Sequence, residues 1–158
     1  MIFVTIGTQD KPFKRLLDAV AKYKHDGTIQ DDVVVQNGTT HFHDETMTII
    51  PFMDMTTFDR YLNQCDLLIT HGGVGTIMNA MALNKPIIAV PRRVQYGEHE
   101  NDHQLQIIDN FAKANHLIAC LDPLDLPVAL AKVSTFKPTP WVSNRQALLD
   151  DIAKELDL

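Results

Sequence analysis

The sequence predicts an α/β domain in which a parallel sheet is covered by helices on both faces. Short, uninterrupted apolar runs alternate along the chain with amphipathic helical patterns, and such runs are typical of strands buried on both sides. The length of 158 residues and the apolar content of 45% suffice for one compact domain with its own core. Neither an internal repeat nor a low-complexity tract breaks the alternation.

Each element has its own signal. The β-branched apolar run at residues 2–6 predicts the first strand, and Pro12 suits the first turn of the helix that follows. Further apolar runs predict strands at residues 33–35, 46–50, 67–70, 87–90 and 117–120. Helical periodicity predicts helices at residues 57–63, 76–83, 102–114 and 124–133. A capping-box pattern at Ser143 and Gln146 predicts a last helix through residue 156.

Charge and composition exclude several classes of protein. The formal net charge of -6, without a run of Lys and Arg, argues against a nucleic-acid-binding protein. Cys65 and Cys120 lie in apolar contexts and are expected to be buried free thiols. The run at residues 2–6 is too short for a secretory leader, and no window reaches the roughly 20 apolar residues of a membrane span. We therefore expect a cytoplasmic protein.

Three polar loops follow predicted strand ends, at residues 7–10, 71–75 and 91–101. Parallel sheets bind ligands at the carboxyl ends of their strands, so the loops are expected to converge on one site. In the second loop, His71, Gly72, Gly73, Val74, Gly75 and Thr76 lead directly into a helix. Glycines let the backbone approach an anion, and a helix N-terminus offers free N–H groups and positive potential. The pattern predicts a phosphate or diphosphate site.

Two other phosphate-binding motifs fit less well. A P-loop is excluded because no Gly-Lys-Ser/Thr follows the glycines. A dinucleotide fingerprint is half present in Gly73-Val74-Gly75, but Met78 stands at its third glycine. No acidic ribose ligand follows the next strand, whereas Arg92 and Arg93 would suit the extra phosphate of NADP. An NADP-dependent oxidoreductase thus remains the weaker alternative. If the chain does not bind NADP, the two arginines are expected to be solvated, or to pair with a phosphate or with acidic groups of a partner.

The segment 96–104 is dense in hydrogen-bonding side chains. His99 and His103 are four residues apart, as in some metal sites, but a helix beginning near Asp102 would separate them. We favour a loop-to-helix junction capped by Asn101 or Asp102, with His and Gln side chains facing a polyhydroxylated ligand. A purely structural role for His99 is the alternative. The cluster from His41 to Glu45 is expected to be a solvated loop. No Ser-His-Asp set or spaced carboxylate pair indicates a hydrolase.

Residues 3–8, 65–76, 84–86 and 97–104 together resemble a set of glycosyltransferases, over most of residues 1–120. The chain resembles the C-terminal domains of glycosyltransferase family 28, the Rossmann-like donor-binding halves of GT-B enzymes. It is similar to the donor domain of the UDP-GlcNAc transferase of peptidoglycan synthesis and to the soluble subunit of the dolichol-pathway UDP-GlcNAc transferase. It is most similar to stand-alone subunits of two-part bacterial capsule and exopolysaccharide transferases, often associated with β-1,4-galactosyl transfer.

The resemblance implies a division of labour. Residues 1–158 form a single domain that binds a UDP-sugar, and a membrane-anchored partner subunit supplies the acceptor site and the catalytic base. The pair transfers a hexose, galactose or GlcNAc, with inversion to a lipid-linked saccharide, and needs neither a metal nor a cofactor. The partner holds the chain peripherally at the inner face of the plasma membrane, and the segment 141–158 is a candidate docking helix. In the alternative, the chain is a non-catalytic nucleotide-sugar-binding or scaffold subunit.

The resemblance also implies roles for individual residues. The residues from His71 to Thr76 would bind the donor diphosphate, and Thr8 and Gln9 of the first loop would face the same cleft. Phe52, Met53 and Asn79 would contact uracil and ribose, with Asn79 where many relatives carry an acidic residue. An amide there lacks charge assistance toward the ribose hydroxyls. The sugar would be bound by Glu98, His99, Asn101, Asp102, His103 and Gln104. No catalytic residue is assigned to this chain.

Overall fold

The computed structural model describes residues 1–140 and 152–153. Six strands form one sheet in the order β3-β2-β1-β4-β5-β6. Every pairing between neighbouring strands is parallel, which confirms the predicted sheet. The strands are β1 (Ile2–Thr5), β2 (Val33–Gln36), β3 (Thr48–Ile50), β4 (Leu67–Thr70), β5 (Ile87–Ala89) and β6 (Ile118–Ala119).

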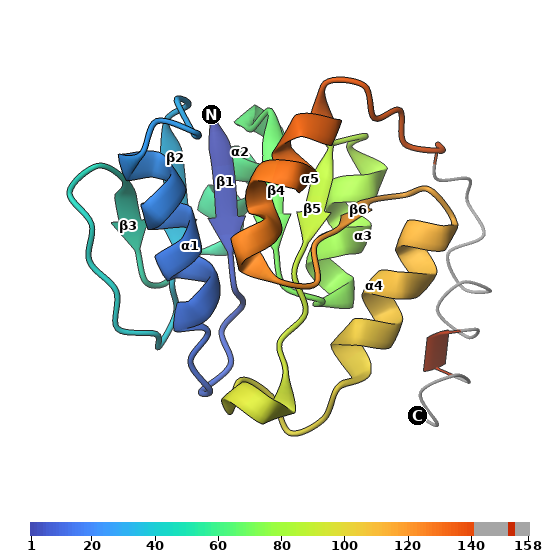
Figure 1. Ribbon diagram of the computed structural model, residues 1–158, viewed down its shortest axis with the longest axis horizontal. Coiled ribbons are helices and arrows are strands. Elements are labelled where there is room, and N and C mark those ends of the chain that lie inside the picture. The colour runs from blue at the N-terminus through green and yellow to red at the C-terminus, as the bar shows by residue number, and fades with distance from the viewer. Residues whose placement is uncertain (141–151, 154–158) are drawn as a thin grey trace.

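Helices cover both faces of the sheet (Figure 1). One face packs against α1 (Lys14–His25) and α5 (Leu126–Val133). The other packs against α2 (Met55–Gln64), α3 (Val74–Ala82) and α4 (His103–Lys113). Two short 3-10 helices, η1 (Val94–Tyr96) and η2 (Pro123–Asp125), lie in the loops after β5 and β6.

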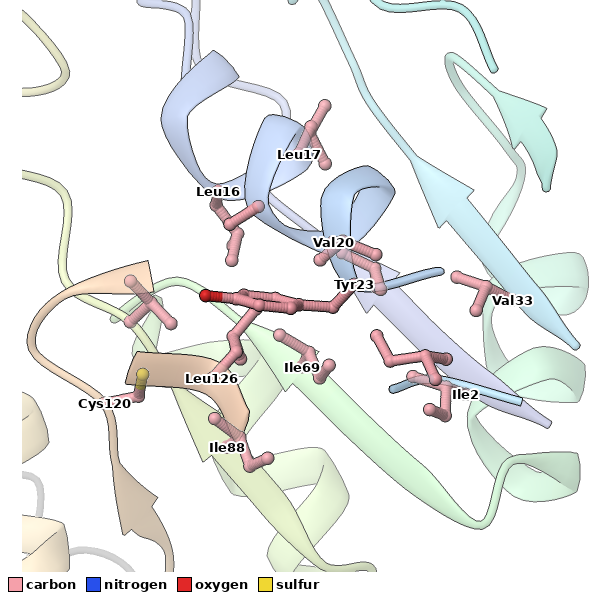
Figure 2. Close-up of a cluster of buried hydrophobic side chains, with 14 of the residues drawn as sticks. Ile2, Leu16, Leu17, Val20, Tyr23, Val33, Ile69, Ile88, Cys120 and Leu126 are labelled. Carbon is pink, nitrogen blue, oxygen red and sulfur yellow. The ribbon is translucent and has the colours of Figure 1, made fainter. Parts of the chain in front are cut away.

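The alternation of side chains along the strands divides the core into two layers. In β1, Val4 belongs to the layer under α1, whereas Phe3 belongs to the layer on the opposite face. Figure 2 shows the first layer, where Leu16 and Val20 of α1 face Ile69 and Ile88 of the sheet and Leu126 of α5. All the labelled apolar side chains in this view are buried, and the side chains of the second layer are buried on the opposite face, so both faces of the sheet are excluded from water.

Several element boundaries differ from the predicted ones. The helix expected from residue 76 begins at Val74, and the helix expected from residue 57 begins at Met55, where the Asp54 carboxylate accepts the Thr57 N–H. The helix expected at 124–133 divides into η2 and α5. The helix predicted at 143–156, and with it the segment 141–158, lies outside the described residues apart from Ile152 and Ala153.

The two cysteines are buried and free, as predicted. Burial raises the pKa of the Cys65 thiol, and burial with the nearby Asp125 and Asp122 carboxylates raises that of Cys120 to about 12. Both thiols therefore stay protonated at neutral pH. None of the helices in the described part of the chain has the length and apolar character that a membrane span requires.

Candidate functional site

A cavity of about 340 Å³ opens at the carboxyl edge of the sheet, among the loops that follow β1, β3 and β4. Five of the predicted site residues line it: Thr8, Met53, Gly75, Thr76 and Asn79. They come from three separate segments, so the fold brings together residues that are up to 71 positions apart in the chain, from Thr8 to Asn79. The cavity lies where open parallel sheets bind their ligands.

The N-terminus of α3 faces this cavity. Gly73 is the N-cap residue and has no side chain to cap the helix. The Ile77 N–H donates to the Gly73 carbonyl at 3.2 Å, and the N–H groups before it have no acceptor within a regular helix. A Cβ atom on Gly75 would meet no heavy atom within 4 Å, so the first turn of α3 borders open space. Free N–H groups and the helix dipole favour an anion here.

His71 lies between the first loop and the glycine loop. The side chain is buried, and a Cβ atom at Gly7 or at Gly73 would lie only 2.8 or 2.6 Å from its ring. Both positions therefore need glycine if the ring is to stay where it is, and Gly7 also has a φ of 77° that other residues avoid. The imidazole thus sets how closely the two loops approach each other.

The Gln104 side chain connects three segments at this edge. Its Oε1 accepts the Gly72 N–H at 3.0 Å and the Arg92 N–H at 3.1 Å, and its Nε2 lies 3.0 Å from Nδ1 of His71. A Cβ atom at Gly72 would lie 2.6 Å from the Cβ of Gln104, so only glycine permits this approach. Since Oε1 receives two N–H groups, Nε2 is the donor to Nδ1 of His71. The neutral imidazole then carries its proton on Nε2.

Burial and, second to it, the positive charge of Arg92 lower the pKa of His71 to about 3, while the Gln104 hydrogen bond opposes the shift. The ring is therefore neutral throughout the physiological range. A neutral imidazole with its proton on Nε2 donates a hydrogen bond and carries no charge.

In the third loop, several acidic and polar side chains bind the protein itself. The Glu98 carboxylate is buried, contacts Arg15 at 3.0 Å through both oxygens, and accepts the Arg93 N–H at 3.0 Å. Asp102 accepts from Nε of Arg93 and from the Val94 N–H. The predicted cap by Asn101 or Asp102 is confirmed for Asn101, whose side chain accepts the His103 N–H at 3.0 Å. Asp102 is the N-cap residue of α4, but its side chain does not cap the helix because the Arg93 and Val94 donors hold the carboxylate.

Arg92 is 1% exposed, so among the alternatives left open for the two arginines, solvation is wrong for this one. Its guanidinium donates to the carbonyls of Ile6, Lys11 and Glu98. This arrangement leaves it poorly placed to bind the extra phosphate of NADP. Arg93 is partly exposed and pairs with Asp102 at 3.2 Å.

The family model described as the glycosyltransferase family 28 C-terminal domain matches residues 1–156. The chain belongs to this family. Met78 lies within α3 and is buried against the sheet, where a dinucleotide fingerprint would need its third glycine.

Curated relatives resemble parts of the chain. The UDP-N-acetylglucosamine transferase subunit ALG13 of Candida albicans is 31% identical over 81 residues, which cover 51% of this chain and 26% of that protein. The human protein of the same name is 25% identical over 128 residues, or 75% of this chain and 11% of that protein. The chain thus spans about a quarter or less of the length of these relatives.

Solved structures show the same fold. An NMR structure of ALG13 superimposes with a TM-score of 0.62 at 20% identity, covering 96% of this chain and 94% of that one. Acinetobacter baumannii MurG superimposes with a TM-score of 0.59 at 16% identity, covering 85% of this chain but only 42% of that one. This family 28 domain therefore has the fold of the C-terminal half of GT-B glycosyltransferases.

The remaining predicted residues do not line this cavity. His71, Gly72 and Gln104 form its buried support, while Val74 begins α3. Gln9 is half-buried, and its carbonyl accepts from the Thr39 hydroxyl at 2.8 Å. Phe52 is 57% exposed next to Met53, and His99 and His103 are half-buried beside the third loop. Among the described residues, no three His, Cys, Asp or Glu side chains group as metal ligands would.

The cavity also has two polar lining residues at strand ends that were not predicted. Thr5 and Gln36 end the neighbouring strands β1 and β2, where they pair in register, and the Thr5 hydroxyl donates to Oε1 of Gln36 at 2.7 Å. Both side chains are buried and line the cavity. The sequence could have indicated both residues, because each is a polar residue at the last position of an apolar strand. That position lies at the carboxyl edge of the sheet.

The lowered pKa of His71 makes the free energy of unfolding depend on pH. In the unfolded chain His71 takes up a proton near its ordinary pKa of 6.5, whereas the folded ring stays neutral down to about pH 3. This contribution is fully present above pH 6.5 and is lost as the pH falls, by up to about 1.4 kcal/mol per pH unit. Urea unfolding from pH 4.5 to 7.5 should show a shallower slope for His71→Asn than for the parent. An NMR titration of the folded ring with a midpoint near 6.5 would contradict the assignment.

Replacing Gln104 by leucine should destabilise the domain strongly. Gln104→Leu leaves the buried Gly72 and Arg92 N–H groups without an acceptor, a loss of roughly 2–4 kcal/mol in the free energy of unfolding. Gln106→Leu makes the same change at an exposed position of the same helix and should stay within about 0.5 kcal/mol of the parent. Denaturant unfolding of both variants measures the difference, and equal losses would rule out the connecting role of Gln104.

Proposed function

We propose that this domain is the UDP-sugar-binding subunit of a two-part inverting glycosyltransferase. The observation that carries the proposal is the uncapped N-terminus of α3 opening into a cavity at the carboxyl edge of a family 28 domain. Relatives named as subunits of a UDP-N-acetylglucosamine transferase support it. The fold corresponds to the C-terminal half of GT-B enzymes, so a second half must complete the active site.

The diphosphate lies against the first turn of α3 in this proposal. The N–H groups of Val74, Gly75 and Thr76 are the donors, and the helix dipole favours the ligand's negative charge. Nε2 of His71 donates from between the two loops, because Nδ1 already accepts from Gln104. Thr8 and Gln9 close the site from the first loop. As the bond to the sugar breaks, the same donors stabilise the charge that develops on the leaving UDP, without a metal ion.

The nucleoside lies along the other wall of the cavity. Met53, Met55 and Phe58 supply an apolar surface there, and Phe52 is exposed beside it, so the uracil ring stacks on this side. Asn79 lines the cavity on the exposed face of α3, where its amide both donates to and accepts from ribose hydroxyls.

The sugar lies toward the third loop, where His99, Asn101 and His103 are only half-buried. Nδ1 of His99 accepts the Asn101 N–H at 3.3 Å, so the neutral ring carries its proton on Nε2. Because Glu98, Asp102 and Gln104 already bind the protein, we assign them the positioning of this loop and of its neighbours. The three half-buried side chains are then the ones that contact the hexose.

The partner completes the reaction. We propose a membrane-anchored subunit that binds a lipid-linked saccharide and supplies the base for the acceptor hydroxyl, in capsule or exopolysaccharide synthesis. The hexose is galactose or GlcNAc. The partner would also hold the chain at the inner face of the plasma membrane. In the alternative function, the chain binds the nucleotide sugar or supports the partner's fold without contributing to the transition state.

Calorimetric titration with UDP, without added metal, tests the donor site. Gly75→Leu places a side chain in the open space at the first turn of α3 and should weaken UDP binding at least tenfold without destabilising the fold. Ala82→Leu, at an exposed position near the end of the same helix, is the control and should bind UDP like the parent. Equal affinities for parent and Gly75→Leu, or a parent that prefers NADPH to UDP, would contradict the proposal.

Turnover by the assembled pair distinguishes a catalytic from a scaffolding subunit. We expect His103→Ala to lower kcat at least tenfold, because a donor to the reacting sugar is lost while assembly is intact. Gln106→Ala, on the exposed side of α4, should leave kcat unchanged. Co-purification with the partner controls for assembly. An unchanged kcat for His103→Ala would favour the scaffold function.

A further inference from the structure

Arg92 is a buried cation whose hydrogen-bond partners are all neutral. Its Nη2 donates to the Ile6 carbonyl at 2.5 Å, and its Nη1 to the carbonyls of Lys11 and Glu98 at 2.8 and 3.0 Å. The guanidinium also lies over the Phe13 ring, 5.1 Å from its centroid. Its buried Nε has no hydrogen-bond partner in the described part of the chain. A guanidinium in this environment is desolvated, and its pKa falls to about 10 for that reason.

The nearest carboxylate does not neutralise this charge. Glu98 raises the pKa of Arg92 from a distance, but both of its oxygens contact Arg15 and one also accepts the Arg93 N–H. Two guanidinium groups, those of Arg15 and Arg92, thus share one carboxylate. These three side chains together carry a surplus of one positive charge, with Arg92 and Glu98 buried and Arg15 partly exposed.

This charge lies directly behind the candidate diphosphate site. Ile6 and Lys11 flank the first loop, so the guanidinium supports residues 7–10 from the inside. Gly7 of that loop packs against the His71 ring, which in turn contacts the position of Gly73. The charge of Arg92 also acts on the His71 imidazole, since it is the second cause, after burial, of the lowered pKa of that ring. The field of Arg92 therefore reaches the space between the two loops.

Other charged and titratable groups near this network are more exposed. Lys11 follows the first loop, His99 and Glu100 lie on the third loop, and His103 begins α4, with Glu100 exposed. Water and salt screen such groups, whereas a charge buried away from solvent is screened much less. Three carbonyls hold the guanidinium in place before any ligand arrives, so binding requires no rearrangement of it.

We propose that Arg92 determines the specificity of this site for the charge of the donor's diphosphate, acting from behind the first loop without touching the ligand. The inference rests on the proposed UDP-sugar site and assigns the residue that makes it prefer a diphosphate over a neutral nucleoside. A role limited to holding the first loop would affect charged and neutral ligands alike. The two roles therefore differ in how the effect of a mutation depends on ligand charge.

The test compares ligands of increasing negative charge. Dissociation constants for uridine, UMP, UDP and inorganic pyrophosphate are measured for the parent, Arg92→Met and Arg92→Lys. In Arg92→Met we expect UDP and pyrophosphate to bind roughly tenfold more weakly, UMP to be affected less, and uridine to change less than twofold. Arg92→Lys keeps the positive charge but lacks the planar guanidinium group, so its site should retain most of the preference for UDP over uridine. Arg93→Met removes the neighbouring, partly exposed arginine and should leave that preference unchanged.

Each result decides a separate question. Two results would overturn the electrostatic role of Arg92. In the first, Arg92→Met weakens the binding of all ligands equally. In the second, Arg92→Lys loses as much of the preference for UDP over uridine as Arg92→Met does. If Arg92→Met does not fold, Arg92→Gln takes its place, with circular dichroism to confirm folding. If pyrophosphate binds in an Arg92-dependent manner but UDP binds no more tightly, the nucleotide-sugar function fails and the role of Arg92 stands. A parent that binds neither pyrophosphate nor UDP would contradict both.

Discussion

The candidate site depends on one side-chain amide, that of Gln104. Parallel strands that end at a common edge leave backbone N–H groups pointing into the loops, and each buried one needs an acceptor. Oε1 of Gln104 supplies that acceptor for the loops after β4 and β5, while its Nε2 orients His71. A helix residue far along the chain thereby fixes two loops and one imidazole. The glycines at positions 7, 72 and 73 follow from this arrangement, because the ring and the amide occupy the space that their side chains would fill.

A consequence is that the polar residues of the site form two tiers. The inner tier, represented by Glu98, Arg92 and Gln104, is buried and bound to the protein. The outer tier, represented by Thr76 and Asn79, lines the open cavity. Buried hydrogen-bond partners fix the conformation of the inner-tier side chains. Because the inner tier supports the outer tier, the outer tier is held in place before any ligand binds. Preorganisation of this kind is what electrostatic stabilisation of a leaving group requires.

Much of the fold was predictable, because periodicity and apolar runs report local structure directly. The parallel sheet, the elements at its edges and the convergence of the three loops agree with the pattern of the sequence. The inner tier was not predictable in the same way. Arg92 stands in a Pro-Arg-Arg sequence that reads as solvated, and its burial depends on carbonyls up to 86 residues away. Asp102 has the appearance of a helix cap, yet the Val94 N–H and Arg93 hold it. Such contacts exist only once distant segments have come together.

The same contacts bear on where the catalytic base resides. Nδ1 of His71 accepts from Gln104, and Nδ1 of His99 accepts from the Asn101 backbone, so each ring has its lone pair engaged. Both imidazoles then present an N–H group, which suits an oxygen-rich ligand and cannot remove a proton from an attacking hydroxyl. Burial also lowers the pKa of both rings, so neither gains a charge near neutral pH that would change this role. If the proposed function holds, these N–H groups are complementary to the leaving diphosphate. The same proposal then assigns the proton acceptor to the second subunit.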